Sequence, residues 1–343
     1  MTEGVPRMRI GIVGFGFMGR MHYRCWQQLP QAEVVAICDA NPDVLEGSDG
    51  GNIAGAADEV DLAGVAIYDD LGKMLAEKQL DAISLTVPSH LHAELSILAL
   101  NAGVNVLCEK PMALNVDDCR RMAEAAEKSG KTLQIGHCVR FWPEYAAAKE
   151  IVAGGKYGRV LAATFQRLAS LPDWAADNWL ADEQRSGGVA LDLHIHDTDF
   201  VQYLFGMPQA VSSFGAIDAS GQLIHIVTNY LYDDEKVVTA EGGWSMAPPF
   251  GFEMSFNIML EAATLVYDCT REPTFRICSA GGESLTPQLE KTDGYFLEIR
   301  NFAETLAGQK IEPVTTLEQS CESVRIVEAE KQSIKQGGRV ELV

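Results

Sequence analysis

The sequence predicts an α/β domain with a doubly wound parallel sheet, followed by an α+β domain with an open, mostly antiparallel sheet. Two observations lead to this fold class. Over residues 8–136, short apolar runs alternate with helical patterns, and a glycine-rich turn follows the first run. After Gly136 the alternation stops and most segments read as strands. We therefore expect one domain over residues 1–136 and a second over residues 137–343.

The composition of the chain argues against some classes of binding partner. The chain has 343 residues and a formal net charge of −21, which argues against nucleic acid or an anionic membrane as a main partner. Eight scattered cysteines without a CxxC pair read as reduced residues of a cytoplasmic protein. No apolar run approaches the roughly 20 residues of a membrane span, and the first seven residues are too few and too polar for a signal peptide.

The first strand, residues 8–13, leads into the turn Gly14-Phe15-Gly16-Phe17-Met18-Gly19 and then a helical pattern. In such a GxGxxG turn, Gly14 permits the tight bend. Gly16 lets the backbone approach a pyrophosphate, and Gly19 lets the helix pack close to the strand. The helix that begins here directs N–H groups at the phosphates. The pattern predicts dinucleotide binding; the alternative is a glycine turn without a ligand.

The second strand, residues 34–38, ends at Asp39, about 20 residues beyond the last glycine, where a ribose-binding acid is expected. Its carboxylate would accept both ribose hydroxyls of an adenosine and repel a 2′-phosphate. Ala40 and Asn41 supply no arginine that would neutralise such a phosphate. We therefore expect NAD as cofactor, in preference to NADP.

The remaining segments of the first domain continue the alternation. Residues 41–64 read as a surface excursion with a short helix. The expected strands are 65–68, 81–87, 105–108 and 132–136, and the expected helices are 70–79, 90–102 and 115–129. Ligands of such sheets lie at the carboxyl ends of the strands. Two polar stretches follow strand ends, residues 86–92 and Glu109-Lys110-Pro111, where a cis bond before Pro111 is possible. The alternative for Lys110 is a solvated loop lysine.

The second domain combines helices over 143–153, 191–204, 295–306 and 317–336 with strands over 160–167, 210–216, 223–232, 236–244, 252–260, 264–268 and 274–277. Asp192 and His196, four residues apart, share one helix face. Imidazole titrates near neutral pH, so His196 suits proton transfer. Two alternatives stay open: a structural histidine, or a metal site using His194 and His196 with Asp197 or Asp199. The two histidines point to different sides, so we expect no metal.

The chain resembles the Gfo/Idh/MocA family (glucose–fructose oxidoreductase, inositol dehydrogenase and rhizopine catabolism) over nearly its whole length. The marks are GFGFMGRMH, Cys108-Glu109-Lys110-Pro111 and Gly187-Gly188-x-x-x-Asp192-x-x-x-His196-Asp197. The resemblance implies a Rossmann domain and a substrate-binding, oligomerising second domain. By carry-over, Lys110 contacts the reacting hydroxyl, His196 is the acid/base and Asp192 is its neighbour on the substrate. Implied nucleotide contacts are Phe17, Met18, Thr86, Pro88 and His92, with Glu109 on the nicotinamide side.

Three further residues are candidates for the substrate region. Arg140 matches an arginine that the family often has at the domain junction. Trp174 and Trp179 precede the Gly187 motif, where an indole would face a sugar ring; the alternative is that both pack at the junction. The sequence departs from the family at His194, where a small residue is usual, and at Ser89, which replaces a common asparagine.

The resemblance implies hydride transfer between a secondary hydroxyl of a sugar, inositol or related polyol and a nicotinamide, by a homodimer or homotetramer. Three alternatives stay open. One is an NAD-binding sensor or regulator on the same fold. Another is an NAD-dependent glycosidase, whose usual Gly-Gly-His-Gly mark is absent, since Val189-Ala190 follows the two glycines. The third is an oxidoreductase that retains its cofactor between two sugars. The sequence does not name the polyol.

Overall fold

The computed structural model describes residues 7–41, 45, 60–171, 176–309 and 312–342. The chain forms two compact units. The first comprises Met1–Cys138, Asp173–Trp179 and Gly294–Cys321, and the second comprises Val139–Pro172, Leu180–Asp293 and Glu322–Val343. The first segment ends close to the boundary expected at residue 136. Gly294–Cys321 belongs to the first unit, although the sequence analysis assigned it to the second domain.

A six-stranded parallel sheet forms the centre of the first unit, in the order β3-β2-β1-β4-β5-β6. This confirms the doubly wound sheet expected from the alternating pattern. Ile10 and Ile12 of β1 are completely buried, as the apolar run predicted. The strands are β1 (Met8–Val13), β2 (Ala32–Cys38), β3 (Ala66–Tyr68), β4 (Ala82–Leu85), β5 (Asn105–Glu109) and β6 (Leu133–Gly136).

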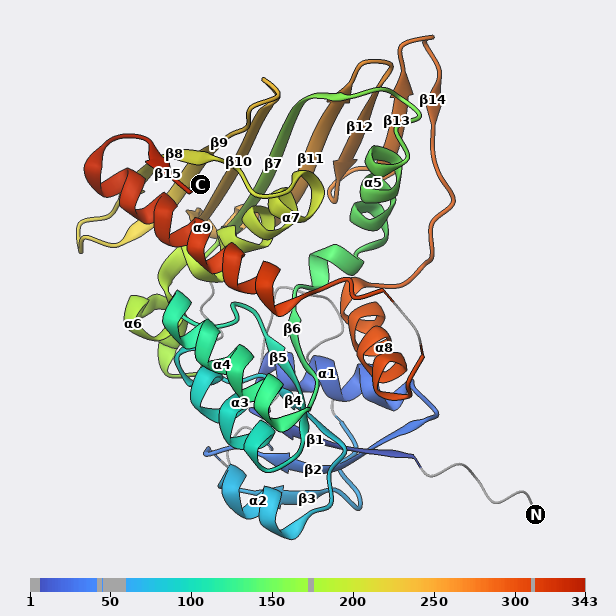
Figure 1. The fold of residues 1–343 in the computed structure, drawn as a ribbon, viewed down its shortest axis with the longest axis vertical. Coiled ribbons are helices and arrows are strands. Elements are labelled where there is room, and N and C mark those ends of the chain that lie inside the picture. Colours follow the sequence, from blue (N-terminus) through green and yellow to red (C-terminus); the bar gives the residue numbers. More distant parts are fainter. Residues whose placement is uncertain (1–6, 42–44, 46–59, 172–175, 310–311, 343) are drawn as a thin grey trace. The chain divides into compact units, whose positions relative to one another are not determined.

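The helices of this unit begin and end where the sequence supplies caps. The side chain of Asn115 accepts a hydrogen bond from the backbone N–H of Asp118 at the start of α4, and Gly130 adopts a left-handed conformation at its end. Figure 1 shows α3 and α4 side by side. The helices are α1 (Phe17–Gln27), α2 (Leu71–Glu77), the short η2 (Ser89–Leu91), α3 (His92–Asn101), α4 (Val116–Ser129) and α8 (Gly294–Leu306).

Helix α8 packs on the parallel sheet although some 150 residues of the second unit precede it. Its Ile299 and Phe302 are completely buried in one apolar cluster with Ile10 of β1 and Trp26 of α1. The rings of Trp26 and Phe302 meet edge to face, with their centroids 6.3 Å apart. The periodicity of α8 predicted the helix but not this partner.

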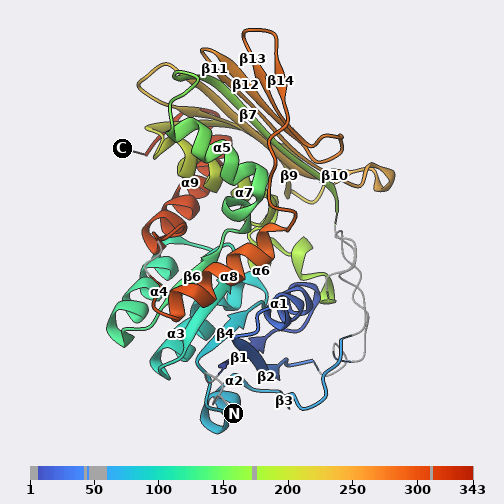
Figure 2. The same ribbon diagram turned by 90° about the vertical axis from the view of Figure 1, so that its right-hand side faces the viewer.

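A nine-stranded sheet forms the second unit, in the order β14-β13-β12-β11-β7-β10-β9-β8-β15 (Figure 2). Only β7 and β10 pair in parallel, so the sheet is mostly antiparallel, as expected. The strands are β7 (Val160–Ser170), β8 (Ala210–Ile217), β9 (Leu223–Leu231), β10 (Val237–Met246), β11 (Phe252–Leu260), β12 (Ala263–Asp268), β13 (Phe275–Ser279), β14 (Ser284–Leu285) and β15 (Val340–Glu341).

One face of this sheet is covered by helices. Alternating residues of β7 and β11, such as Phe165 and Phe256, are buried and pack around Tyr145 of α5 and Phe200 of α7. The residues between them point to the other face, over which Figure 2 draws no helix among the described residues. The helical segments that lie wholly or partly in this unit are η3 (Cys138–Phe141), α5 (Pro143–Ala153), η4 (Ala176–Ala181), α6 (Glu183–Ser186), η5 (Ala190–His194), α7 (Ile195–Phe205), η6 (Pro248–Phe250) and α9 (Leu317–Gln336).

Two further properties concern the whole described chain. All eight cysteines are free thiols, and the five from Cys25 to Cys138 are buried. Among the helices that the structure describes, none combines the length and the hydropathy that a membrane span requires.

Candidate functional site

The glycine turn between β1 and α1 closes tightly against the end of β4. Gly14 has a φ of +85°, and a Cβ there would lie 2.7 Å from the carbonyl oxygen of Thr86. A Cβ on Gly19 would lie 2.1 Å from the carbonyl oxygen of Gly14. The hydroxyl of Thr86 donates a hydrogen bond of 2.6 Å to that same oxygen. Two of the three glycines are therefore required by backbone contacts alone.

Helix α1 begins at this turn without a side-chain cap, since its first flanking residue is Gly16. The N–H groups at the start of a helix need an acceptor, and a pyrophosphate is the acceptor that this kind of turn receives. Gly16 and Met18 are partly exposed, whereas Phe15, Phe17 and Gly19 are buried. The uncapped helix and the bare glycine backbone fit a dinucleotide phosphate.

Asp39 lies at the carboxyl end of β2, next to this turn. One oxygen of its carboxylate accepts a hydrogen bond of 2.7 Å from the backbone N–H of Phe15, and the other accepts one of 2.8 Å from Asn41. Each oxygen of an ionised carboxylate has a second acceptor position, so a ribose hydroxyl remains a possible donor. The acid thus holds the glycine turn, and its contact with the ribose stays a prediction.

The stretch that follows β4 carries Thr86, Pro88 and His92. Thr86 and Pro88 are half-buried at the end of β4, whereas His92 is buried. The Nδ1 of His92 lies 2.8 Å from the carbonyl oxygen of Pro111, and its Nε2 lies 3.0 Å from that of Val87. The ring therefore bridges the turns after β4 and β5. A contact between His92 and the nucleotide stays a prediction.

The turn after β5 carries Lys110. The peptide bond between Lys110 and Pro111 is cis, which the sequence analysis had allowed. Lys110 is half-buried, while Glu109 before it and Pro111 after it are buried. The carboxylate of Glu109 accepts hydrogen bonds from the ring of His22 at 3.0 Å and from the backbone N–H of Lys110 at 3.2 Å.

His22 was not among the candidate residues of the sequence analysis. It lies on α1 three residues beyond Gly19 and is completely buried. A lone histidine on the buried side of a helix was the only available signal, because its partner Glu109 is 87 residues away in the chain. The structure links the glycine-turn helix to the lysine turn through this pair.

In the second unit, Asp192 and His196 lie on one continuous helical stretch. Residues 190–194 form a π-helical turn, η5, which continues into α7. Such turns are rare and often occur at functional sites. Of residues 189–202, only Asp192, Leu193 and His196 are not buried. The acid and the histidine therefore share the accessible side of this stretch, as their spacing predicted.

Two buried ion pairs hold this stretch in place. Arg140 of η3 makes two hydrogen bonds of 2.8 Å to the carboxylate of Asp199. Arg167 of β7 makes hydrogen bonds of 2.9 and 3.2 Å to Asp197, directly after His196. These contacts pair the carboxylates of Asp197 and Asp199 with arginines. A contact between Arg140 and substrate stays a prediction.

Both units match one protein family. Residues 8–137 match its N-terminal part, described as "Oxidoreductase family, NAD-binding Rossmann fold", and residues 145–266 match the GFO/IDH/MocA C-terminal domain. The chain belongs to the Gfo/Idh/MocA family. The resemblance seen in the glycine turn, the Glu109-Lys110-Pro111 turn and the Asp192–His196 motif is thereby confirmed.

Several named relatives are dehydrogenases of inositols or sugars. The chain is 24% identical to scyllo-inositol 2-dehydrogenase (NAD(+)) of Bacillus subtilis over 327 residues, 91% of this chain and 90% of that protein. It is 30% identical to D-apiose dehydrogenase of Paraburkholderia graminis over 205 residues, 60% of this chain and 52% of that protein. The chain spans about half the length of the curated relatives that it matches at 30% identity or more, between 51% and 58%.

Solved structures of this family share the fold. Levoglucosan dehydrogenase, solved with NADH and levoglucosan, has a TM-score of 0.81 at 21% identity, covering 98% of this chain and 99% of that one. The myo-inositol 2-dehydrogenase of Lactobacillus plantarum has a TM-score of 0.80 at 24% identity, covering 98% and 100%.

His194, where this chain departs from the usual Gfo/Idh/MocA pattern, is completely buried. Its Nε2 lies 3.5 Å from the Oε2 of Glu330 on α9 and 3.5 Å from the hydroxyl of Tyr230. That hydroxyl and Thr198 both donate to the other oxygen of Glu330, at 2.9 and 3.1 Å. A Cβ on Gly242 would lie 2.8 Å from the His194 ring, so this glycine makes room for it. His194 therefore packs behind the helix and not on its accessible side.

Of the two candidate tryptophans, only Trp179 lies among the described residues. Trp179 is half-buried in η4. Trp174 lies outside the described residues, as does most of the excursion expected over residues 41–64. A role for either indole in holding substrate stays a prediction.

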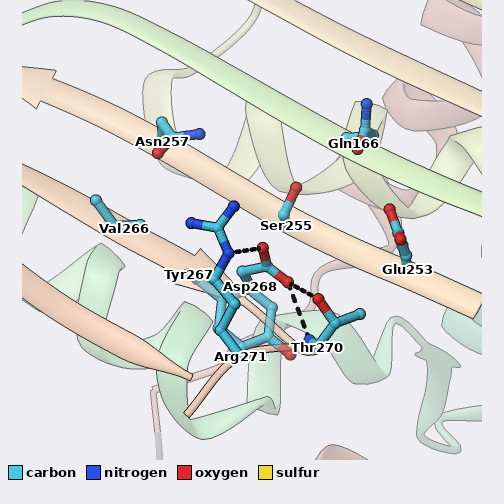
Figure 3. A pocket seen from close by; sticks show the side chains of 9 residues that line it. All are labelled: Gln166, Glu253, Ser255, Asn257, Val266, Tyr267, Asp268, Thr270 and Arg271. Atoms are coloured by element: carbon cyan, nitrogen blue, oxygen red, sulfur yellow. Dashed lines mark hydrogen bonds and ion pairs between the residues drawn. The ribbon is translucent and has the colours of Figure 1, made fainter. Parts of the chain in front are cut away.

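A polar hollow lies on the open face of the antiparallel sheet, away from α7 (Figure 3). Asp268 there is held by Arg271 at 2.7 Å and by the hydroxyl and N–H of Thr270. None of the predicted site residues of this family member lines it. The other lining residues are Gln166, Glu253, Ser255, Asn257, Val266 and Tyr267.

Proposed function

We propose that this chain is an NAD-dependent dehydrogenase that transfers a hydride between a secondary hydroxyl of a sugar, inositol or related polyol and the nicotinamide. The observation that carries the proposal is the combination of an uncapped α1 with the carboxylate of Asp39 at the neighbouring strand end. Strand, glycine turn, helix and acid in this order are the parts of a dinucleotide site. The activities named for the relatives support the substrate class.

The groups assigned to the chemistry are His196, Lys110 and Asp192. In the oxidative direction, His196 takes the proton of the hydroxyl, while the ammonium of Lys110 stabilises the negative charge that develops on that oxygen. Asp192, on the same accessible side as His196, orients the ring or a neighbouring hydroxyl. The bound cofactor accepts the hydride. The glycine turn and Asp39 hold and orient the dinucleotide.

The preference for NAD over NADP follows from charge. A 2′-phosphate would meet the Asp39 carboxylate, and the neighbouring Ala40 and Asn41 carry no cation. Repulsion between this phosphate and the carboxylate therefore disfavours the binding of NADP.

The test is an absorbance assay for reduced nicotinamide, with NAD and then NADP against a panel of inositols, aldoses and anhydrosugars. We expect turnover with one class and a higher kcat/KM for NAD. Binding of NAD without turnover on any member would favour a sensor on the same fold. Binding of neither dinucleotide would contradict the proposal.

A further inference from the structure

Three titratable side chains meet in a buried cluster next to the lysine turn. They are His22 of α1, Glu109 at the end of β5 and Glu298 of α8. Their nitrogen and carboxylate oxygen atoms lie within 4.8 Å of one another. His22 and Glu298 are completely buried, and Glu109 is 7% exposed. All three belong to the first unit.

Glu109 has a hydrogen-bond donor on each oxygen. The ring of His22 contacts Oε1 at 3.0 Å, and the backbone N–H of Lys110 contacts Oε2 at 3.2 Å. Burial raises the pKa of the Glu109 carboxyl, but the hydrogen bond and charge of His22, then the charges of Lys110 and His92, outweigh it and leave the pKa below its usual value. Glu109 is therefore the ionised member of the cluster.

Glu298 differs from Glu109 in its hydrogen-bond donors and in the direction of its pKa shift. Among the described residues, neither of its oxygens has a hydrogen-bond partner. Its Oε1 and the Oε1 of Glu109 both lie 3.3 Å from the place where a Cβ on Gly136 would be, so this glycine leaves room for the two carboxyls. When two carboxyl groups share a buried site, ionising both is energetically unfavourable, so one of them keeps its proton. Burial, and then the charge of Glu109, raises the pKa of Glu298 well above its usual value.

We propose that Glu298 is a positioning residue, which stays protonated at neutral pH and donates its O–H to the Glu109 carboxylate. Glu109 is then the one carboxylate of the cluster, and it accepts hydrogen bonds from His22, Glu298 and the backbone N–H of Lys110. This contact fixes the carboxylate from the side of α8 and thereby the turn that carries Lys110. The structural part of the proposal stands by itself; its effect on turnover rests on the proposed dehydrogenase function.

The main experiment measures the free energy of unfolding against pH for the wild type and Glu298→Gln. A carboxyl whose pKa is raised on folding stabilises the protein below its unfolded pKa and loses that contribution as the pH rises through its folded pKa. The wild type should therefore lose stability above about pH 4.5. Glu298→Gln lacks this loss, so its stability relative to the wild type should increase with pH.

Glu304→Gln is the matched control, because Glu304 lies on the same helix, is half-buried and shows no such contact with Glu109. Its curve should run parallel to that of the wild type. Parallel curves for the wild type and Glu298→Gln would overturn the proposal. An infrared difference spectrum gives a direct readout: the carbonyl band of a neutral carboxylic acid should be present in the wild type at neutral pH and absent from Glu298→Gln. A bound divalent cation, found by elemental analysis in the wild type and lost in this variant, would also overturn it.

Turnover provides the second readout. The amide of Glu298→Gln donates to Glu109 as the acid does, whereas Glu298→Ala leaves that side of the carboxylate without a donor. We expect Glu298→Ala to lower kcat by about tenfold or more, and the glutamine variant to recover most of this loss. Equal kcat values for the two variants would contradict the positioning role. If the wild type turns over no substrate, the proposed function fails, while the unfolding and infrared results still decide the state of Glu298.

Discussion

The carboxylate of Asp39 accepts hydrogen bonds from two backbone amides, so its removal would affect the glycine turn as well as the cofactor. Asp39→Asn is the informative change, since the amide oxygen still accepts a hydrogen bond while the charge is lost. We expect the ratio of kcat/KM for NAD to that for NADP to fall by about tenfold or more, because the repulsion of a 2′-phosphate is removed.

The control for this variant is Asp69→Asn. Asp69 is an exposed acid just beyond the neighbouring strand β3, and it pairs with Lys73 at the surface. Its loss should leave the NAD to NADP ratio unchanged. An unchanged ratio in Asp39→Asn would mean that this carboxylate does not select the cofactor.

The proton acceptor His196 and the charge-stabilising Lys110 are both tested by truncation to alanine. Loss of a positioned acid/base group lowers turnover by about 10²-fold or more, which we expect for His196→Ala and Lys110→Ala. Binding of NAD, measured by calorimetry, should persist in both variants. His225→Ala is the histidine control, because His225 pairs with Glu241 at 2.9 Å on β9 and β10, apart from the candidate residues. Turnover like that of the wild type in His196→Ala would refute its assignment.

At the scale of elements, η5 and α7 depend on arginines from other segments. Arg140 of η3 is 2% exposed and lies over the ring of Tyr203 as well as against Asp199. Ser323 of α9 donates to the same carboxylate at 2.8 Å. The helix that carries His196 is therefore held by segments far apart in the sequence.

Arg140→Ala should lower the free energy of unfolding by roughly 3–5 kcal/mol, because it leaves the buried charge of Asp199 without its cation. The double variant Arg140→Leu with Asp199→Leu should lose less than the sum of the two single changes. Urea unfolding measures the free energy of unfolding of Arg140→Ala, of the two single leucine variants and of the double variant. The exposed pair Arg159–Glu261 gives the comparison, and Arg159→Ala should change stability by about 1 kcal/mol or less. A comparably small change in Arg140→Ala would show that the buried pair contributes little.

Among the helices and strands, the sequence predicted those that local patterns determine. Helices α8 and α9 begin and end within one residue of the expected bounds, because apolar periodicity and caps are properties of neighbouring residues. The two-residue strands β14 and β15 were not predicted, since only pairing with β13 and β8 defines them. The same reason explains which parts of the candidate site the sequence could predict. Gly14 and Asp39 follow a spacing rule, whereas the contact of His22 with Glu109 requires the folded sheet.

At the scale of the whole molecule, the open face of the antiparallel sheet carries an apolar row. Val237 of β10, Ala162 of β7 and Met259 of β11 lie in register across three strands. Val237 is 60% exposed and Met259 is 46% exposed, although Val238 and Ile258 beside them are buried. Exposed apolar side chains grouped on a sheet face are typical of interaction surfaces.

We therefore predict that the protein self-associates through this face, and that Val237→Glu combined with Met259→Glu shifts it toward monomers. The substitutions place charge on a row that would face a second acidic copy, where the net charge of −21 per chain already opposes association. Light scattering coupled to size exclusion measures the mass. Leu98→Glu, at a 42% exposed position on α3, should leave the mass unchanged. Higher salt should favour association in the double variant by screening the added charge. A monomeric wild type, or a double variant of unchanged mass, would exclude this face as the interface.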